Sequence, residues 1–245
     1  MEVITLANFK GGVGKSTTAH NVAAALALKG KKVCMGDLDP QCNLTMACGQ
    51  IDNLDSGTIE AIFSGDQVEP IQIKKNLSLI RGDIRLAVSD MQFGGLMKRE
   101  HVLEKFIKKA KLKESFDYLV LDCPPYLGLL TQNAMVVSDY LFVPIDCEYF
   151  STYGLTFFRQ FLNENDYEID GIICTKHDRR LTLHNDFVET LRENYGELVF
   201  KNTIPKNVSI SESQAMGTDV FEYAPKSAGA KTYKALTKEI TTILQ

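Results

Sequence analysis

The chain has 245 residues, 44% hydrophobic and 24% charged, which excludes a disordered or low-complexity protein. Lys and Arg number 27 against 31 Asp and Glu, a formal net charge of −4, so nucleic-acid binding would require a local basic patch or oligomerisation. The longest apolar run, Val22 to Leu28, is too short to span a membrane, and the N-terminus does not resemble a secretory signal. We therefore expect a cytosolic protein whose six cysteines, which form no Cys-x-x-Cys pair, remain reduced.

Short apolar segments alternate with helical patterns along the chain. The expected strands are Val3–Ala7, Lys32–Met35, Leu77–Ile80, Tyr118–Leu121, Tyr140–Pro144, Gly171–Thr175 and Val199–Thr203. The expected helices are Ser16–Lys29, Val102–Lys111, Leu129–Val137, Leu155–Asn163, Asp186–Asn194 and Lys226–Leu244. The least regular stretch, Asp52–Gly82, is interpreted as surface helix and loop. This alternation predicts an α/β fold with a doubly wound, mostly parallel sheet flanked by helices. Because no linker-like segment divides the chain, residues 1–245 are expected to form one domain.

The segment KGGVGKST follows the first expected strand and opens the first helix. Its glycines allow backbone N–H groups to surround phosphate oxygens, and the helix N-terminus favours an anion. Lys15 supplies a positive charge to the β- and γ-phosphates, and the Ser16 hydroxyl is a ligand for Mg²⁺. We therefore expect ATP and Mg²⁺ as cofactors. The residues predicted to bind ATP here are Lys10, Gly11, Gly12, Val13, Gly14, Lys15, Ser16 and Thr17.

A second lysine distinguishes this segment from the usual pattern G-x-x-x-x-G-K-[ST], whose first glycine would fall at Phe9. With Lys10 leading it, the segment resembles the deviant Walker A loop of the ParA/MinD/Soj group of ATPases. The resemblance runs from Val3 to the last helix and implies a P-loop fold in which ATP-bound subunits form a sandwich homodimer. It also implies that Lys10 reaches across to the partner's phosphates, so Lys10 and Lys15 are both predicted to be catalytic.

Carboxylates follow two of the expected strands. Asp37 and Asp39 come after the second strand, and Asp122 ends a later apolar strand, which places them at the edge where α/β sheets bind ligands. Such carboxylates can hold Mg²⁺ or orient the attacking water in phosphoryl transfer. The segment Asp37–Asn43 resembles the family's switch I, which implies that Asp39 is needed for hydrolysis and that Asp37 supports the metal region. The predicted metal-binding residues are Ser16, Asp37 and Asp122.

The resemblance also implies a base-binding segment and a DNA-binding surface. Pro205 and Asn207 are expected to flank the adenine. Basic residues on the dimer surface are expected to contact DNA without sequence preference, so binding should weaken steeply with salt. The candidate DNA-binding residues are Arg179, Arg180, Lys206, Lys231 and Lys234, with Lys238 on the same helix as the last two.

These expectations together describe a cytoplasmic, nucleoid-associated ATPase that partitions a chromosome or plasmid and whose slow hydrolysis is stimulated by a ParB-like adaptor. No helix-turn-helix extension is expected before the first strand. One alternative is the positioning of a protein cargo, and another is a MinD-like membrane-bound ATPase. The C-terminal residues Ile240–Gln245 lack the bulky aromatics and basic flank of an amphipathic anchor, so no stable membrane anchor is expected. A third alternative is a metabolic ATPase, either a nitrogenase-type iron protein or a small synthetase.

Overall fold

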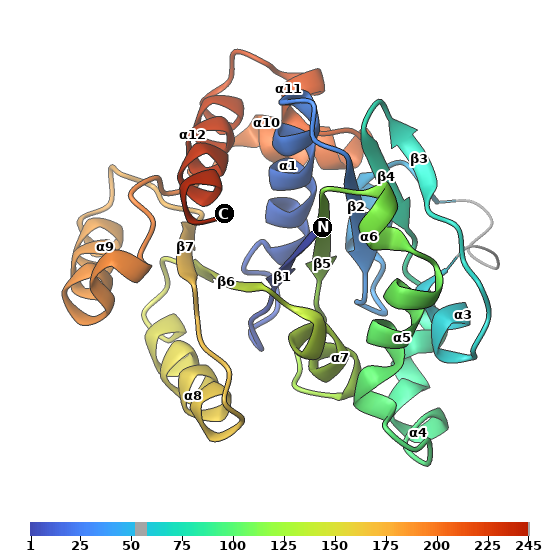
Figure 1. Cartoon of the computed structure of the whole chain (residues 1–245). Helices are drawn as coiled ribbons and strands as arrows, with labels where there is room; N and C mark the ends of the chain where they lie inside the picture. The colour runs from blue at the N-terminus through green and yellow to red at the C-terminus, as the bar shows by residue number, and fades with distance from the viewer. Residues whose placement is uncertain (52–57, 245) are drawn as a thin grey trace.

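The computed structural model describes residues 1–51 and 58–244. Among these residues seven strands form one sheet in the order β3-β4-β2-β5-β1-β6-β7. The strands are β1 (Glu2–Leu6), β2 (Val33–Asp37), β3 (Ile71–Lys74), β4 (Leu77–Ile80), β5 (Tyr118–Asp122), β6 (Tyr140–Asp146) and β7 (Gly171–Thr175). Every neighbouring pair is parallel except β3 and β4, which are antiparallel. The predicted mostly parallel α/β sheet is confirmed (Figure 1).

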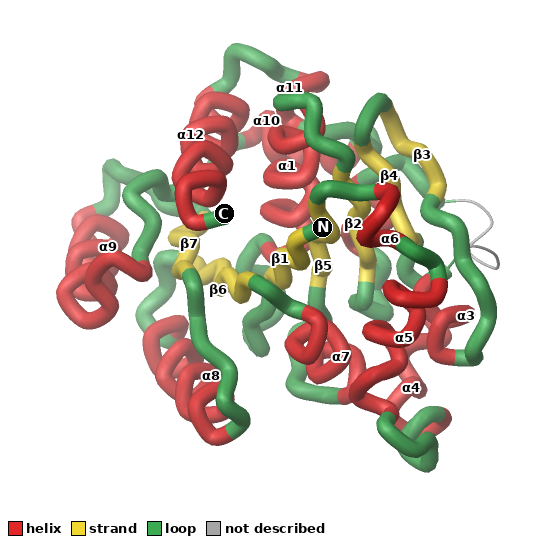
Figure 2. The backbone as a smooth tube through the Cα atoms, in the orientation of Figure 1, coloured by secondary structure: helices red, strands yellow, loops and turns green. Residues whose placement is uncertain are grey.

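Helices cover both faces of this sheet, and Figure 2 shows the yellow strands lying between two groups of red helices. The α-helices are α1 (Lys15–Leu28), α2 (Asn43–Ala47), α3 (Ile59–Phe63), α4 (Ser89–Gln92), α5 (Val102–Lys109), α6 (Leu112–Ser115), α7 (Leu129–Val137), α8 (Ser151–Glu164), α9 (Thr182–Tyr195), α10 (Val208–Ala215), α11 (Val220–Tyr223) and α12 (Ala228–Ile243). Short 3₁₀ turns are η1 (Ile84–Val88), η2 (Arg99–His101) and η3 (Gly196–Leu198).

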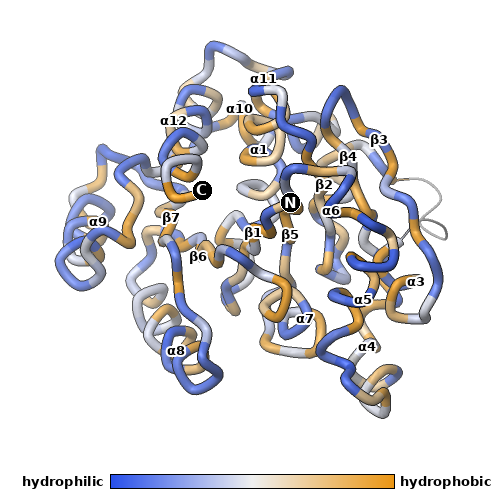
Figure 3. Tube along the Cα trace, in the orientation of Figure 1, coloured by the Kyte–Doolittle hydropathy of each residue, from blue (hydrophilic) through white to orange (hydrophobic). Residues whose placement is uncertain are grey.

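Each face of the sheet contributes to its own apolar core. Val3 and Ile4 are neighbours in β1, yet Val3 packs in the core under α5, α7 and α8, and Ile4 packs in the core under α1 and α12. This division arises because successive strand side chains point to opposite faces. Strands covered on both faces are nearly all apolar, and Figure 3 shows the central strands coloured as hydrophobic, with hydrophilic residues on the outlying helices α8 and α9.

Two sequence-based predictions about strands are wrong. Residues 71–74, interpreted as helix or loop, form the edge strand β3 on β4. The predicted strand Val199–Thr203 makes one isolated bridge, between Val199 and Ile172. The reason lies in α12, where the Glu239 carboxylate accepts hydrogen bonds from the backbone N–H groups of Lys201 and Asn202 at 2.7 and 2.9 Å. Those donors are therefore unavailable for a sheet ladder, although the segment is apolar. The predicted surface stretch also includes residues 52–57, which lie outside the described residues.

The sheet brings the predicted site segments to one edge. Strands β1, β2 and β5 are adjacent and parallel, and in their register Asp37 lies beside Asp122 and Leu6 lies beside Asp122. The glycine-rich loop follows β1 at this edge, and the Asp37–Asn43 segment follows β2. Because the carboxyl ends of parallel strands meet in one crevice, the fold itself assembles the site. Within the described ranges, no helix combines the length and the apolar character that crossing a membrane requires.

Candidate functional site

The glycine-rich loop is held in its conformation by its own glycines and by β7. Gly12 and Gly14 have φ values of 74° and 87°, a left-handed backbone that residues with a Cβ rarely adopt. A Cβ at Gly12 would meet no atom within 4 Å, so the backbone conformation, rather than a lack of space, calls for glycine there. The Thr175 hydroxyl donates to the Val13 carbonyl oxygen at 2.8 Å. The loop therefore enters α1 with its N–H groups presented at the helix N-terminus, a site that favours anions.

Lys15 lies inside this loop and is buried. Its Nζ donates to the carbonyl oxygen of Lys10 at 3.1 Å. Burial lowers the pKa of Lys15, and the carboxylates of Asp122 and Asp39 oppose that shift because they favour the charged ammonium. A cation is thus held beneath the loop, close to two acidic side chains.

The Asp122 carboxylate at this edge lacks the interactions that a buried charged group needs. It is fully buried, and neither carboxylate oxygen accepts a hydrogen bond of normal geometry from the described residues. Burial and the neighbouring Asp37 raise the pKa of Asp122, while the Ser16 side chain and Lys15 oppose that shift. A buried carboxylate without a partner is costly, and a divalent cation would supply the missing interaction. The donor set of Asp122 and Ser16 therefore fits a magnesium ion.

Asp37, also predicted as a metal residue, already has hydrogen-bond partners in the protein. Its Oδ2 accepts from the Thr45 backbone N–H at 2.8 Å and from the Thr45 hydroxyl at 2.6 Å, and its Oδ1 accepts from the Asp39 N–H at 3.2 Å. The Thr45 oxygen in turn accepts from the Gly82 N–H at 2.8 Å. Burial raises the pKa of Asp37 to about 6. These contacts fix the ends of β2 and β4 to α2, so Asp37 is better suited to position the site, with Asp122 as the better candidate ligand.

Asp39 lies in the loop between β2 and α2 and is nearly buried. Its Oδ1 accepts from the Gln41 N–H at 2.9 Å, and it lines a cavity together with Lys15, Ser16 and Gly11. Burial raises the pKa of Asp39, whereas the Gln41 N–H and Lys15 lower it. The loop thus brings a second carboxylate to the lysine and serine that the sequence placed in the glycine-rich segment.

The second lysine of the loop, Lys10, points to a different acidic group. Its Nζ lies 2.9 Å from Asp146 Oδ1, 2.7 Å from Glu148 Oε2 and 2.9 Å from Ser151 Oγ. Burial alone would lower the pKa of Lys10, but its hydrogen bonds to Glu148 and Asp146 outweigh that effect and raise it. The Ser151 hydroxyl also donates to Asp146 through a short contact. Lys10 is therefore held against residues at the end of β6 and the beginning of α8 of its own chain.

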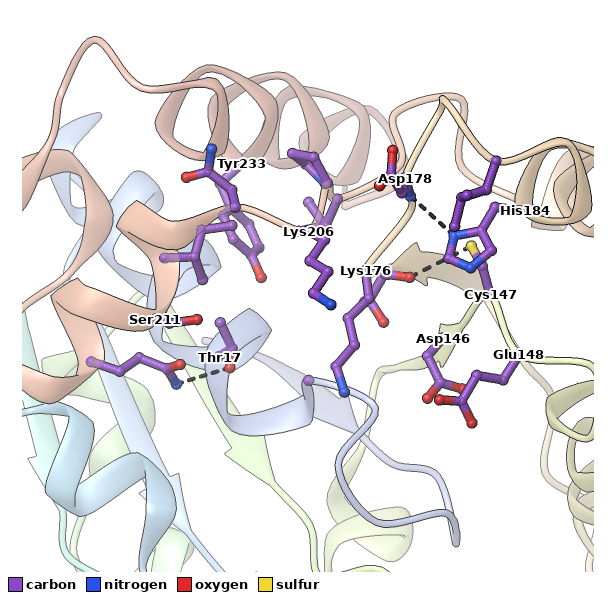
Figure 4. A pocket seen from close by; sticks show the side chains of 18 residues that line it. Thr17, Asp146, Cys147, Glu148, Lys176, Asp178, His184, Lys206, Ser211 and Tyr233 are labelled. Atoms are coloured by element: carbon purple, nitrogen blue, oxygen red, sulfur yellow. Dashed lines mark hydrogen bonds between the residues drawn. The ribbon is translucent and has the colours of Figure 1, made fainter.

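Two connected cavities lie at this edge. One has a volume of about 600 Å³ and is lined by the glycine-rich loop, Asp39 and Pro125. The other, shown in Figure 4, has a volume of about 500 Å³ and is lined by Pro205 and Asn207 among others. Both cavities are lined by Gly14, Thr17, Lys176 and Gln214. The structure therefore joins the segment predicted to bind a base to the loop predicted to bind phosphates.

Several residues of this site were missed by the sequence analysis. Asp146 is the last residue of β6, Glu148 lies just beyond it and Lys176 follows β7, so their position at carboxyl ends of strands is a signal that could have identified them. Gln214 in α10 donates to the Thr17 hydroxyl at 2.8 Å. No local pattern identifies Gln214, because its position depends on the packing of α10 against α2, α11 and α12.

The structure divides the predicted DNA-binding residues among three places. Arg180, exposed on the loop before α9 together with Arg179, forms an ion pair with Asp178 at 2.7 Å. Lys231 and Lys234 are exposed on α12, where Lys234 and Lys238 lie close enough to lower the pKa of Lys29 in combination with its burial. Lys206 lines the cavity of Figure 4 and points into it. Across residues 1–51 and 58–244, no group of three or more His, Cys, Asp or Glu side chains is arranged to hold a metal ion.

Known proteins are similar to this chain in sequence and in fold. A family model described as an AAA domain matches residues 1–205. The chain is 36% identical over 253 residues to the sporulation initiation inhibitor protein Soj of Bacillus subtilis, with 98% of both chains covered. It is 33% identical over 252 residues to the chromosome-partitioning ATPase Soj of Treponema pallidum, covering 98% of this chain and 96% of that one.

A solved structure of cobyrinic acid a,c-diamide synthase from Mycobacterium smegmatis, with a bound ATP analogue and magnesium, matches with a TM-score of 0.86 and 29% identity over 100% of this chain and 96% of that chain. The resemblance read from the loop and its acidic partners is thus confirmed by relatives that extend over nearly the whole sequence. The chain belongs to the Soj/ParA family of partition ATPases.

Proposed function

We propose that this chain acts as a single domain that binds ATP with Mg²⁺ and hydrolyses it slowly to ADP and phosphate. The observation that carries the proposal is Asp122, a buried carboxylate beside Ser16 and Lys15 that accepts no hydrogen bond of normal geometry from the described residues. Mg²⁺ is usually held by one or two carboxylates together with phosphate oxygens and water, which agrees with the lack of a complete set of protein ligands here. The magnesium-bound relative of 29% identity supports this assignment.

In this proposal each residue has a distinct task. The N–H groups of the loop and Lys15 hold the β- and γ-phosphates, and Ser16 and Asp122 hold Mg²⁺, which would neutralise charge on the phosphate oxygens. Asp39 orients the attacking water, a task for which its place in the phosphate cavity is suited. Pro205 and Asn207 contact the base in the adjoining cavity. Catalysis then consists mainly of positioning and charge stabilisation, as phosphoryl transfer requires.

We further propose that ATP drives formation of a homodimer in which Lys10 contacts the partner's phosphates. Lys10 would have to leave Asp146 and Glu148 first. Because its side chain is 29% exposed and that of Glu148 is 67% exposed, the ion pair with Glu148 costs little to break. The Asp146 side chain is only 4% exposed, so leaving it is the larger cost that the partner's phosphates must offset. The partner's phosphates carry a higher charge than the carboxylates of Asp146 and Glu148. They would therefore bind the Lys10 ammonium more strongly than those carboxylates do.

The partition role of the family leads to a proposal about cargo. The dimer binds DNA without sequence preference through the lysines of α12 and the arginines before α9, and a ParB-like adaptor stimulates hydrolysis and release. Dimerisation doubles each basic patch, which is how a chain with a net charge of −4 could bind DNA. We accordingly propose a cytoplasmic, nucleoid-associated location.

The dimer proposal is tested with two variants of the full chain. Asp39→Ala should retain ATP binding, lose turnover and accumulate as a dimer in light scattering, because binding persists without hydrolysis. Lys10→Ala should bind ATP and remain a monomer. A monomeric Asp39→Ala protein at saturating ATP, or a dimeric Lys10→Ala protein, would contradict the role of Lys10.

The DNA proposal is tested by a salt titration of binding to duplex DNA in the presence of ATP. Combining Lys231→Glu and Lys234→Glu should weaken binding and make its salt dependence shallower, whereas Lys113→Glu on α6 serves as a matched control. ATPase activity without DNA should be unchanged in both. Unaltered DNA binding would remove α12 from the interface, and absence of DNA binding by the wild-type dimer would favour a protein cargo.

A further inference from the structure

Lys176, directly after β7, has a backbone conformation that is uncommon for its residue type. Its φ is 52°, in the left-handed region that costs a residue with a Cβ on the order of 1 kcal/mol. Residues held in this way are concentrated at ligand sites, because the surrounding structure must impose the conformation. Here β7 on one side and His177 on the other impose it. The N–H of His177 donates to the Ile204 carbonyl oxygen at 2.9 Å, and its ring contacts Thr203 and Asn185 at 2.8 and 3.0 Å.

The place of Lys176 is the junction of the two cavities. It lines both of them, together with Gly14, Thr17 and Gln214. Figure 4 shows its side chain extending from the end of β7 toward the glycine-rich loop at the beginning of α1. A nucleotide with its base near Pro205 and its terminal phosphates at Lys15 would have to pass this point. The part of such a ligand nearest Lys176 is therefore the one that joins base to terminal phosphates, the ribose and the α-phosphate.

The charges around Lys176 leave its ammonium available. The acidic residues of the same cavity, Asp146 and Glu148, are bound to Lys10, and Asp178 is bound to Arg180. No hydrogen bond or ion pair joins the Lys176 side chain to any of the residues that the structure describes, and the residue is exposed. A solvated ammonium aimed into a cavity is a suitable partner for a phosphate oxygen, and a contact of this kind needs no rearrangement of other residues.

We propose that Lys176 is a second lysine acting within the same subunit, and that its ammonium contacts the α-phosphate of a bound nucleoside di- or triphosphate. This inference rests on the proposed nucleotide binding. It assigns Lys176 to positioning: Lys15 serves the phosphates that react, and Lys176 serves the phosphate that remains on the nucleotide. The contact is then common to ATP and ADP, so Lys176 contributes equally to holding the substrate and the product.

The test is calorimetric titration of the full-length protein with ATP and, separately, with ADP, both with Mg²⁺. Lys176→Met keeps the apolar stem and removes the charge. It should lower the affinity for both nucleotides by the same factor, about tenfold, since losing a hydrogen bond to a charged group lowers affinity by about that much. The salt dependence of affinity should also become shallower. Lys176→Arg should restore most of the affinity, which a loss of packing alone would not explain, and Lys113→Met on the exposed face of α6 is the matched control.

The possible outcomes distinguish a failure of this inference from a failure of the proposed nucleotide binding. If the wild-type protein binds neither nucleotide, the proposed function fails. If the wild-type protein binds both, and Lys176→Met binds both with unchanged affinity, the contact with the α-phosphate is refuted. A loss confined to ATP would refute it as well, because it would place the ammonium at the γ-phosphate. Equal losses with ATP and ADP, restored by Lys176→Arg, would support it.

Discussion

The two ends of helix α1 lie in contrasting environments. Its body packs in a core of apolar residues with α12, where Leu236 and Ile240 are fully buried. Its first turn lies at the crevice, where Lys15 is buried and Asp122 has no hydrogen-bond partner among the described residues. The first region is held mainly by apolar packing, and the second leaves charged groups that a ligand can satisfy. Stability and function are thus divided along a single helix.

The largest effect expected at the crevice comes from removing Lys15. Lys15→Ala leaves Asp122 and Asp39 without their nearest cation and removes the charge that faces the phosphates. Affinity for ATP should fall on the order of a thousandfold, as for one half of a buried charge pair. Fluorescence titration with a labelled nucleotide measures it. Lys29→Ala, at the other end of α1, should bind ATP as the wild type does, and equal losses in the two variants would contradict the contrast.

A substitution in the apolar core beside α1 should lower stability and leave ATP affinity unchanged. Leu236→Ala removes a fully buried side chain and should lower the free energy of unfolding by ~2–5 kcal/mol. ATP affinity, measured where the variant is still folded, should not change, because Leu236 lies in neither cavity. Urea denaturation and nucleotide titration together check this prediction. A large loss of affinity in the folded variant would mean that the core and the crevice are not separate.

A third prediction concerns a substitution that should stabilise the folded protein, whereas most substitutions destabilise it. Asp122→Asn should raise the free energy of unfolding of the ligand-free protein at pH 8 by roughly 1–3 kcal/mol, while abolishing hydrolysis. Burial raises the pKa of Asp122, so the folded state binds its proton more tightly than the unfolded state does. Wild-type stability therefore improves as the pH falls through the folded pKa. The advantage of the Asn variant should shrink as the pH is lowered toward 5, and an advantage independent of pH would refute this account.

The smallest expected effect concerns the resting place of Lys10. Glu148→Gln weakens one of its ion pairs, so the dimer should form at about two- to fivefold lower ATP, given the ~0.2–1 kcal/mol of an exposed pair. Light scattering across an ATP series measures the midpoint. Glu189→Gln, on the exposed face of α9, is the control. A midpoint shifted to higher ATP would show that Glu148 assists the dimer and does not restrain Lys10.

Sequence patterns predicted this molecule best where burial on both faces decides the structure. The apolar runs of β1, β5 and β7, and the glycine-rich loop with its acidic partners, were all recognisable locally. The edge strand β3 was missed because its half-buried residues gain their conformation from pairing with β4. Residues 199–203 are apolar enough for a strand, but the carboxylate of Glu239, some forty positions later, takes the necessary donors.

The site follows the same rule. Positions defined by a loop and the strand before it could be predicted, whereas those defined by distant packing could not. Gln214 reaches Thr17 only because α10 packs against α2, α11 and α12. The acidic partners of Lys10 come from a segment about 136 residues away in the sequence, so no local pattern connects them.

The hydrogen bonds of Glu239 have a mechanical consequence. They attach the C-terminal part of α12 to Lys201 and Asn202, a few residues before Pro205, which borders the cavity proposed to hold the base. The last helix is therefore linked by hydrogen bonds to the segment that leads to the side of the cavity where a base would bind. By reciprocity, filling that cavity would stiffen the helix that carries Lys231 and Lys234. What binds on the outside of the molecule and what binds in its crevice would then each report on the other through one glutamate.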